Sequence, residues 1–252
     1  GQSSEMEAIY KLSKQYGFKI IEDASHAIGG KYKNKPIGSC NYSDITVFSF
    51  HPVKIITSGE GGMALTNNSI LAKRMRVLRS HGISSEEKDM LSKPIDQLWN
   101  YQQVDLGFNY RMSDIHAALG LSQMKRLNEF VIKRHKIAYR YNKKLSGLPV
   151  VLPYQHDDSY SSFHLYIIRL KLDLISKSHK QVYSALRKEG ILVNLHYIPI
   201  YLMPFYEQLG FKKGHCPQAE KYFSEAISIP IHPLLKESDL NHIFSSLSSI
   251  LS

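Results

Sequence analysis

The chain has 252 residues, of which 43% are apolar and 21% are charged, and its formal net charge is +10. This length suits one large domain or two modest ones, and the composition is typical of a soluble globular protein. No apolar run approaches the roughly 20 residues that span a bilayer, and residues 1–16 resemble a polar amphipathic helix rather than a signal peptide. Two distant cysteines outside any CxxC pattern predict a reducing, cytoplasmic location without disulfides.

The excess of basic residues is compatible with two classes of partner. Nucleic acid is one class, and phosphorylated cofactors or nucleotide sugars are the other. The 32 Lys and Arg residues are spread along the chain in short pairs, whereas a nucleic-acid-binding protein is expected to gather them on one face. We therefore expect neither nucleic acid nor membrane as a partner, and salt-dependent retention on DNA would revive the first possibility.

The first 66 residues alternate between predicted helix and predicted strand. The pattern Ser4-x-x-Glu7 resembles a capping box that opens a helix. Runs rich in β-forming residues predict strands over 18–23, 45–50 and 63–66, the second of them buried on both faces. A Gly59–Gly62 turn separates the last two strands, and Ser69 is expected to cap the next helix. This alternation predicts an α/β domain with a mainly parallel sheet.

The second half of the chain predicts a smaller domain. Residues 83–108, with Pro94, predict a long irregular loop. Residues 113–145 then have helical apolar spacing, which predicts one very long helix or two with a bend near Gly120. Strands over 163–170, 191–195 and 227–229 and helices over 178–189, 218–225 and from about residue 237 predict an α+β arrangement. The expected domains are residues 1–122 and 123–252, joined by the long helix.

Asp23 and Lys54 are the strongest candidates for a reactive pair. An acidic residue at the carboxyl end of a strand points into the crevice where open α/β sheets bind ligands, and Lys54 follows the next strand. Pyridoxal 5′-phosphate (PLP) chemistry needs such a pair: the lysine amine forms an imine with the cofactor aldehyde, and the carboxylate keeps the pyridine nitrogen protonated. A surface lysine and a strand-end aspartate would satisfy the same spacing, so the spacing alone leaves both interpretations open.

Longer motifs around this pair resemble the DegT/DnrJ/EryC1/StrS family of PLP-dependent sugar aminotransferases. The motifs that carry the resemblance are Glu22-Asp-Ala-Ser-His26, Val47-Phe-Ser-Phe-His-Pro-Val-Lys54, Thr57-Ser-Gly-Glu-Gly-Gly62, Gly107-Phe-Asn-Tyr-Arg-Met112, Phe163-His-Leu-Tyr166, His196-Tyr-Ile-Pro199 and Ser228-Ile-Pro-Ile-His-Pro233. Their order along nearly the whole chain is specific, although each short motif alone is not. The resemblance implies an aspartate-aminotransferase-like fold of fold type I, with a partial large domain and a small C-terminal domain.

The resemblance also implies a role for each matching residue. Lys54 resembles the Schiff-base lysine, whose free amine shuttles a proton. Asp23 resembles the partner of the pyridinium nitrogen, and His26 resembles the Gln or His that packs near the ring. Ser49 resembles a hydroxyl donor to the phosphate. Asn109 resembles a residue that reaches the phosphate of the partner subunit's cofactor, which implies a homodimer with shared active sites.

Four further residues are candidates for binding the substrate, each with an ordinary structural alternative. Arg111 is a candidate for binding substrate anions or for pairing with a surface acid. His164 and His196 are candidates for lining a sugar site or for structural roles. Tyr197 is a candidate for stacking on uracil or sugar, although any one of 16 tyrosines is more often structural. Ser113 is better explained as a helix cap, and none of the 12 histidines has zinc-ligand spacing, so we expect no metal.

Within the family, His51-Pro-Val-Lys54 before the glycine turn is most similar to the branch that acts in pseudaminic-acid biosynthesis. That branch transaminates C4 of a UDP-linked 4-keto-6-deoxy-HexNAc with glutamate as the amino donor. Ile55 and Ser58 depart from the proline and threonine expected there. Lys54 also speaks against the related PLP-dependent sugar dehydratases, which have histidine at the lysine position.

The resemblance begins midway through the family's pattern. Members carry a preceding segment with the first strands of the large domain and a phosphate-binding loop. We therefore expect that this polypeptide alone binds PLP weakly or not at all. The alternative function is a truncated, catalytically silent family member that serves as a binding or dimerisation module.

Overall fold

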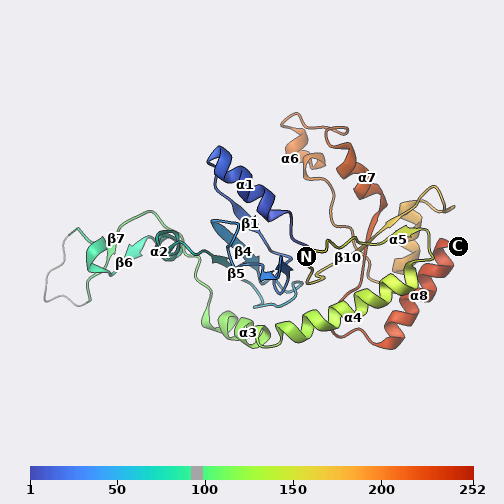
Figure 1. Cartoon of the computed structure of the whole chain (residues 1–252), viewed down its shortest axis with the longest axis horizontal. Coiled ribbons are helices and arrows are strands. Elements are labelled where there is room, and N and C mark those ends of the chain that lie inside the picture. The colour runs from blue at the N-terminus through green and yellow to red at the C-terminus, as the bar shows by residue number, and fades with distance from the viewer. Residues whose placement is uncertain (92–98) are drawn as a thin grey trace. The chain divides into compact units, whose positions relative to one another are not determined.

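The computed structural model describes residues 1–91 and 99–252 (Figure 1). Part of the loop predicted over 83–108, including Pro94, lies outside the described residues. The chain forms two compact units, Ser3–Leu127 and Asn128–Ser252, and Gly1–Gln2 belongs to the second of them. The unit boundary thus falls at Leu127, whereas the sequence pattern placed the domain boundary after residue 122.

The unit Ser3–Leu127 alternates helix and strand. Its elements are α1 (Met6–Tyr16), β1 (Ile21–Asp23), β2 (Lys31–Tyr32), β3 (Lys35–Pro36), β4 (Ile45–Ser49), β5 (Gly62–Leu65), α2 (Ser69–Leu78), β6 (Ile83–Ser84), the 3-10 helix η1 (Glu87–Asp89), β7 (Gln102–Gln103) and α3 (Asp114–Met124). All three strands predicted in the first 66 residues are present, although β1 is shorter than predicted.

The central sheet of this unit has the order β1-β4-β5 (Figure 1). β1 and β4 are parallel, with Asp23 beside Val47, whereas β4 and β5 are antiparallel. The sheet is therefore mixed, because the chain reverses direction between β4 and β5, and β5 pairs with β4 itself. Burial along β4 also alternates: Thr46 and Phe48 are buried and their neighbours are half-buried, so the prediction of burial on both faces is wrong for the described chain.

Two predicted helix caps differ from the caps in the structure. Glu5 is the N-cap of α1 and makes no side-chain capping bond, so the capping box at Ser4 and Glu7 does not form. The Glu7 carboxylate instead pairs with Lys11 and Lys33. Asn68 caps α2 in place of Ser69, because its side chain accepts hydrogen bonds from the amides of residues 70 and 71.

The unit that ends at Ser252 is α+β, as predicted. Its elements are α4 (Leu127–Leu145), β8 (Val150–Val151), β9 (Ser159–Tyr160), β10 (Tyr166–Leu170), α5 (His179–Lys188), the 3-10 helix η2 (Ile200–Leu202), α6 (Pro204–Glu207), α7 (Pro217–Glu225), β11 (Ala226–Ile229) and α8 (Glu237–Leu251). The helical stretch that was predicted to bend near Gly120 breaks instead at residues 125–126, between α3 and α4. The predicted strand over 191–195 is reduced to one bridge between Asn194 and Ser228.

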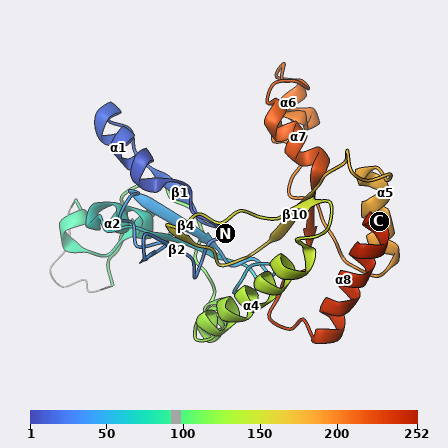
Figure 2. The same ribbon diagram turned by 45° about the vertical axis from the view of Figure 1, so that its right-hand side comes forward.

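The core of this unit lies between an antiparallel sheet and three helices. The sheet has the order β11-β10-β8, and α5 and α8 run side by side (Figures 1 and 2). Ile168 of β10, Leu186 of α5 and Leu247 of α8 are completely buried together with Tyr141 of α4. A Ser178–Gln181 capping box starts α5. None of the helices formed by the described residues has the length and apolarity needed to cross a bilayer.

Arg134 of α4 is a buried cation that ties its helix to two distant backbone segments. Its side chain is 5% exposed, and its Nη1 donates to the carbonyl oxygens of Phe163 at 2.9 Å, of His164 at 3.3 Å and of Ile231 at 2.8 Å. Burial lowers the pKa of this guanidinium to about 10, so it stays charged at neutral pH.

We expect Arg134→Met to destabilise the protein by roughly 3 kcal/mol or more, because buried carbonyls would lose a charged donor. Lys136→Met is the matched control, since Lys136 is exposed on the same helix. Urea unfolding of both variants measures the difference in the free energy of unfolding. Equal stabilities of the two variants would contradict the structural role given to Arg134.

Candidate active site

The central sheet divides its polar side chains between two faces. Residues paired across strands share a face, and so do residues two apart along one strand. Asp23 therefore lies on the same face as Val47 and Ser49, and we call this the Asp23 face. Glu22 and Thr46 lie on the reverse face, where the Thr46 hydroxyl donates to the Glu22 carboxylate at 3.0 Å. The strand register thus gathers two predicted site residues, Asp23 and Ser49, on one face.

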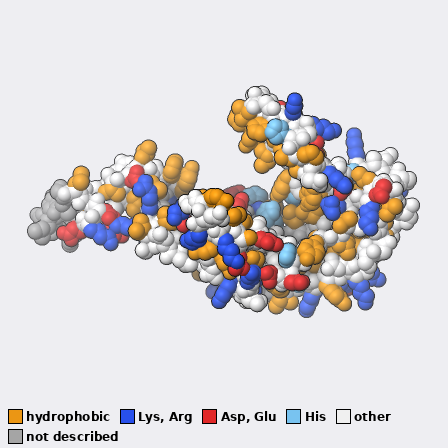
Figure 3. All heavy atoms as spheres, turned by 45° about the horizontal axis from the view of Figure 1, so that its top comes forward, with side chains coloured by type: hydrophobic (Ala, Val, Ile, Leu, Met, Phe, Trp, Pro, Cys, Tyr) orange, Lys and Arg blue, Asp and Glu red, His pale blue; other side chains and the backbone are white. Residues whose placement is uncertain are grey.

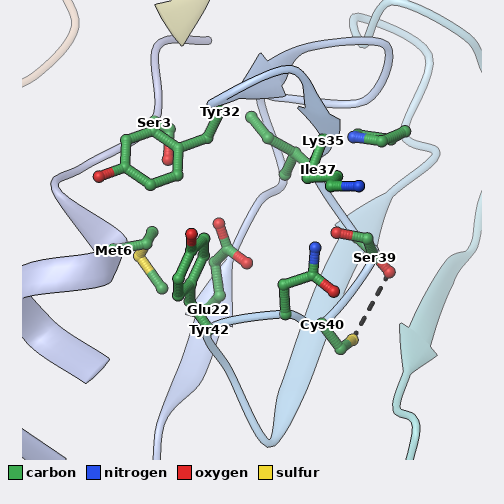
Figure 4. A pocket seen from close by; sticks show the side chains of 12 residues that line it. Ser3, Met6, Glu22, Tyr32, Lys35, Ile37, Ser39, Cys40 and Tyr42 are labelled. Carbon is green, nitrogen blue, oxygen red and sulfur yellow. Dashed lines mark hydrogen bonds between the residues drawn. The ribbon is translucent and has the colours of Figure 1, made fainter. Parts of the chain in front are cut away.

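Around Glu22 and Thr46, the reverse face is covered by the chain itself. Figure 4 shows Glu22 in a small pocket with Met6 of α1, Tyr32 of β2 and the loop residues Cys40 and Tyr42. On the Asp23 face, by contrast, Asp23 is exposed, and so are Ala64 and Gly62 of β5. Short side chains at these β5 positions leave the surface beside Asp23 and Ser49 open. At the ends of β1 and β4, the described chain therefore leaves the Asp23 face open to a ligand.

Asp23 is held as an ionised carboxylate. Its Oδ1 accepts hydrogen bonds from the hydroxyl of Ser25 at 2.5 Å and from the amide of Ser25 at 3.0 Å. These two bonds lower the pKa of Asp23, partial burial opposes them, and the nearby charges of His26 and Lys54 lower the pKa further. The arrangement keeps a negative charge at the end of β1 throughout the neutral pH range.

Lys54 stands on a loop that leaves β4 and returns to it. Phe50 closes this loop: its amide donates to the carbonyl of Gly61 at 2.8 Å, and its own carbonyl accepts from the amide of Ser58 at 3.0 Å. Ile55 and Ile56, directly after Lys54, are buried and anchor the loop. The proline expected at position 55 is therefore replaced by an apolar anchor.

The Lys54 amine shares its surroundings with Asp23. Partial burial lowers the pKa of Lys54, and the negative charge of Asp23 raises it. The two charges are therefore within electrostatic reach of one another. An amine with a lowered pKa is neutral, and hence nucleophilic, in a larger fraction of molecules at neutral pH than an ordinary lysine.

The other two predicted cofactor residues of this region lie close by in the chain. Ser49 ends β4, and its hydroxyl accepts a long hydrogen bond from the amide of His51 at 3.4 Å. His26 stands half-buried in the turn after β1, and its charge acts on Asp23. The structure thus brings Asp23, His26, Ser49 and Lys54 to the carboxyl ends of β1 and β4.

Asn109 and Arg111 lie elsewhere in the same unit, and both are exposed. Asn109 forms an isolated bridge with Ser80, just after α2. The two segments approach each other closely here, since a methyl group added to Gly107 would lie 2.1 Å from the amide nitrogen of Gly82. None of the hydrogen bonds or ion pairs found among residues 1–91 and 99–252 joins Asn109 or Arg111 to Asp23 or Lys54.

The remaining three candidates belong to the unit Asn128–Ser252. His164 is buried, and its carbonyl oxygen accepts from Arg134. The Nδ1 of His196 lies 2.7 Å from the hydroxyl oxygen of Ser228. Tyr197 is 59% exposed, and its ring meets the ring of His196 edge-on at 4.6 Å. His196 and Tyr197 therefore lie together, whereas His164 is placed as a core residue.

Sequence reasoning missed several residues that support the site. Ser25 holds the Asp23 carboxylate, and the spacing Asp-x-Ser, typical of a local side-chain turn, was an available signal. Thr57 donates to the carbonyl of Phe50 at 2.9 Å and accepts from the amide of Gly59 at 2.9 Å. Ser113, as expected, caps α3 by accepting from the amide of His116.

These residues fit the functional groups of PLP. An ionised carboxylate fits a protonated pyridine nitrogen, and an amine with a lowered pKa fits an aldehyde. The Ser49 hydroxyl is suited to a phosphate oxygen. All three groups come from one open face of one sheet or from the loop beside it.

Comparison with known proteins gives a consistent result. Residues 1–248 match the DegT/DnrJ/EryC1/StrS aminotransferase family. The chain is 36% identical over 252 residues to the UDP-4-amino-4,6-dideoxy-N-acetyl-beta-L-altrosamine transaminase of Campylobacter jejuni, a match that covers 100% of this chain and 63% of that protein. The chain spans only 62% to 65% of the length of such curated relatives.

Solved structures agree with this match. PseC of Helicobacter pylori, an aminotransferase involved in the biosynthesis of pseudoaminic acid, superposes with a TM-score of 0.87 at 33% identity, over 99% of this chain and 64% of PseC. The PLP form of Spr1654 from Streptococcus pneumoniae superposes with a TM-score of 0.84 at 27% identity, over 98% of this chain and 65% of Spr1654. The fold class expected from the sequence is thereby confirmed. The chain belongs to the DegT/DnrJ/EryC1/StrS aminotransferase family.

Proposed function

We propose that the protein is a PLP-dependent aminotransferase that moves an amino group from glutamate to C4 of a UDP-linked 4-keto-6-deoxy-HexNAc, in the biosynthesis of a pseudaminic-acid-type sugar. The observation that carries the proposal is that the Lys54 amine and the Asp23 carboxylate stand at the carboxyl ends of β4 and β1, close enough for the charge of each to shift the pKa of the other. The choice of sugar is supported by the relatives, since the Campylobacter protein is named for a UDP-linked amino sugar and PseC for pseudoaminic acid.

Each site residue has a chemical task in this proposal. PLP, when bound, supplies an aldehyde that combines with amines and a ring that withdraws electrons. Lys54 would bind the cofactor through Nζ and, when that amine is free, would take up and return a proton. Asp23 would hold a proton on the ring nitrogen through its carboxylate, which Ser25 orients. Ser49 would donate to the phosphate, and His26 would pack near the ring.

The test of this function is amino transfer to the sugar. With PLP, UDP-4-keto-6-deoxy-HexNAc and ¹⁵N-labelled glutamate, we expect the label to appear on C4 of the sugar and 2-oxoglutarate to form in equal amount. Label on C3 would retain the aminotransferase and overturn the proposed regiochemistry. A chain that dimerises and neither transfers the label nor binds PLP at Lys54 would establish the alternative, a catalytically silent dimerisation module.

We also propose that the active enzyme is a homodimer in which Asn109 reaches the partner subunit's cofactor. Apolar side chains between residues 99 and 124 support this, because large exposed apolar patches mark interfaces. The most exposed of them are Trp99, Tyr101, Leu106, Tyr110, Ile115 and Leu121.

We expect Ile115→Arg to weaken dimerisation by about 10- to 100-fold, because it places a charge in the proposed interface. Ile115 is 83% exposed in the described chain. Leu174→Arg, at an exposed apolar position of the other unit, is the control and is expected to have no effect. Sedimentation equilibrium measures the dissociation constant. A wild-type protein that stays monomeric at high concentration would contradict the proposal.

Nucleic-acid binding is the competing proposal that the net charge of +10 suggests. On the face shown in Figure 3, Lys and Arg side chains are scattered among acidic and apolar ones rather than gathered into a single patch. This distribution favours the aminotransferase. Retention on DNA that falls steeply with salt would favour the competitor.

A further inference from the structure

The loop that carries Lys54 ends in a turn that is packed against α3. A methyl group added to Gly61 would lie 2.5 Å from Cε of Met112 and 2.7 Å from Oγ of Ser58. A methyl group added to Gly59 would lie 3.3 Å from Cδ2 of His116. The turn backbone therefore approaches Met112, just before α3, and His116, in its first turn, so closely that a larger residue at either glycine would push the two segments apart.

Ser58 is the most enclosed residue of this contact. It is completely buried, and its hydroxyl donates to the carbonyl of Glu60 at 2.7 Å. On its other side, a methyl group at Gly120 of α3 would lie 3.3 Å from Cβ of Ser58. Ser58 is therefore enclosed between the glycine turn and the middle of α3, four residues after Lys54 in the chain.

Two of the contacting residues share one side of α3. His116 and Gly120 are four residues apart in α3, and residues with this spacing lie on one side of a helix, whereas Met112 lies in the segment just before the N-cap Ser113. Gly120 is inside α3, where glycine costs about 1 kcal/mol relative to alanine. The need for space beside Ser58 explains why a helix-weakening residue stands at this position.

We infer that Met112, just before α3, and His116 and Gly120, within α3, form a seat that positions Lys54 by fixing the turn after it. The inference rests on the proposed function for its effect on turnover. Its physical basis, however, is the packing of the turn. The backbone of Phe50 hydrogen-bonds to both Ser58 and Gly61 and so closes the loop that carries Lys54. A displaced turn would therefore shift this loop and with it the Lys54 amine. These are positioning residues, since none of them is proposed to touch the reacting atoms.

A size series at Gly120 tests the inference, with Ala118→Val as the control on an exposed side of the same helix. In the PLP-free protein, the pH dependence of Lys54 acetylation by acetic anhydride gives the titration midpoint of its amine, which Asp23 and burial both influence. We expect the midpoint to rise toward that of an ordinary lysine, slightly in Gly120→Ala and by about 0.5 pH units or more in Gly120→Val, as the displaced amine becomes hydrated. Ala118→Val is expected to leave the midpoint unchanged.

Turnover provides the second readout. We expect kcat to fall about 10- to 100-fold in Gly120→Val while KM for glutamate changes by less than about threefold, because the loss is one of orientation. Gly120→Ala favours the helix, so its thermal stability is expected to be maintained while its Lys54 midpoint still shifts. Wild-type values of midpoint and kcat in Gly120→Val would overturn the inference, and so would an equal change in Ala118→Val. If the wild type shows no transamination, the proposed function fails, and the titration alone decides the role of the seat.

Discussion

Replacement of Lys54 by arginine is expected to abolish amino transfer, with a fall in kcat of roughly 10⁴-fold or more, because arginine supplies neither the amine that binds the cofactor nor a group that can return a proton. Arginine keeps the positive charge that helps to lower the pKa of Asp23, so the fold and the local electrostatics are expected to be retained. The loop itself is anchored by Ile55 and Ile56, which the substitution leaves in place.

Borohydride reduction in the presence of PLP makes this prediction specific to one residue. In the wild type we expect a pyridoxyl group on the peptide that contains Lys54, and in Lys54→Arg we expect that group to be missing. Lys31→Arg, an exposed lysine in the same unit, is the matched control and should leave the adduct in place. An adduct that stays on another lysine in Lys54→Arg, with turnover near that of the wild type, would show that the reactive amine is elsewhere.

Replacement of Asp23 by asparagine is expected to lower kcat about 10- to 100-fold, while PLP is still trapped at Lys54. The substitution removes a charge-assisted hydrogen bond to the ring nitrogen, and such bonds contribute roughly 1.5–3 kcal/mol. The smaller loss for Asp23 than for Lys54 follows from their tasks, because Asp23 tunes the cofactor whereas Lys54 bonds to it. A kcat in Asp23→Asn equal to that of the wild type would contradict the role of the carboxylate.

The pH dependence of stability gives an independent check on Asp23. Its pKa in the folded chain is lower than its ordinary value of 3.8, chiefly because of the hydrogen bonds from Ser25. The ionised carboxylate therefore favours folding at every pH above that ordinary value, and its contribution is lost as the pH falls through the lowered pKa. We expect the stability difference between wild type and Asp23→Asn to be constant near neutral pH and to shrink in acid. A difference that grows in acid would contradict the assignment.

The local chemistry of the site was predictable from sequence because it depends on short-range order. Asp23 ends a strand and Lys54 follows the next one, and parallel pairing of these strands is enough to bring their ends together. The face on which Asp23 lies was not predictable in the same way. It depends on strand register, and a shift of one residue would exchange Asp23 for Glu22.

The supporting contacts could not be read from the sequence because they join distant segments. Gly120 lies 62 residues after Ser58, and no local pattern indicates that the two touch. The same limit applies to Arg134, which resembles any helical arginine in the sequence and yet donates to carbonyls of two distant segments. The predictions of helix caps at Ser4 and Ser69 failed for a different reason. Each helix has its N-cap at the adjacent residue, Glu5 or Asn68, and the exact end of a helix depends on backbone geometry at a single residue.

The proposed active site requires the Lys54 amine and the Asp23 carboxylate to lie close together, and titration of that amine in wild type and in Asp23→Asn tests this most directly. Loss of the carboxylate removes a charge that raises the pKa of Lys54 and leaves the burial that lowers it. We therefore predict that the titration midpoint of Lys54 falls further below the ordinary lysine value in Asp23→Asn. A midpoint that is the same in both proteins would show that the two groups do not share a site.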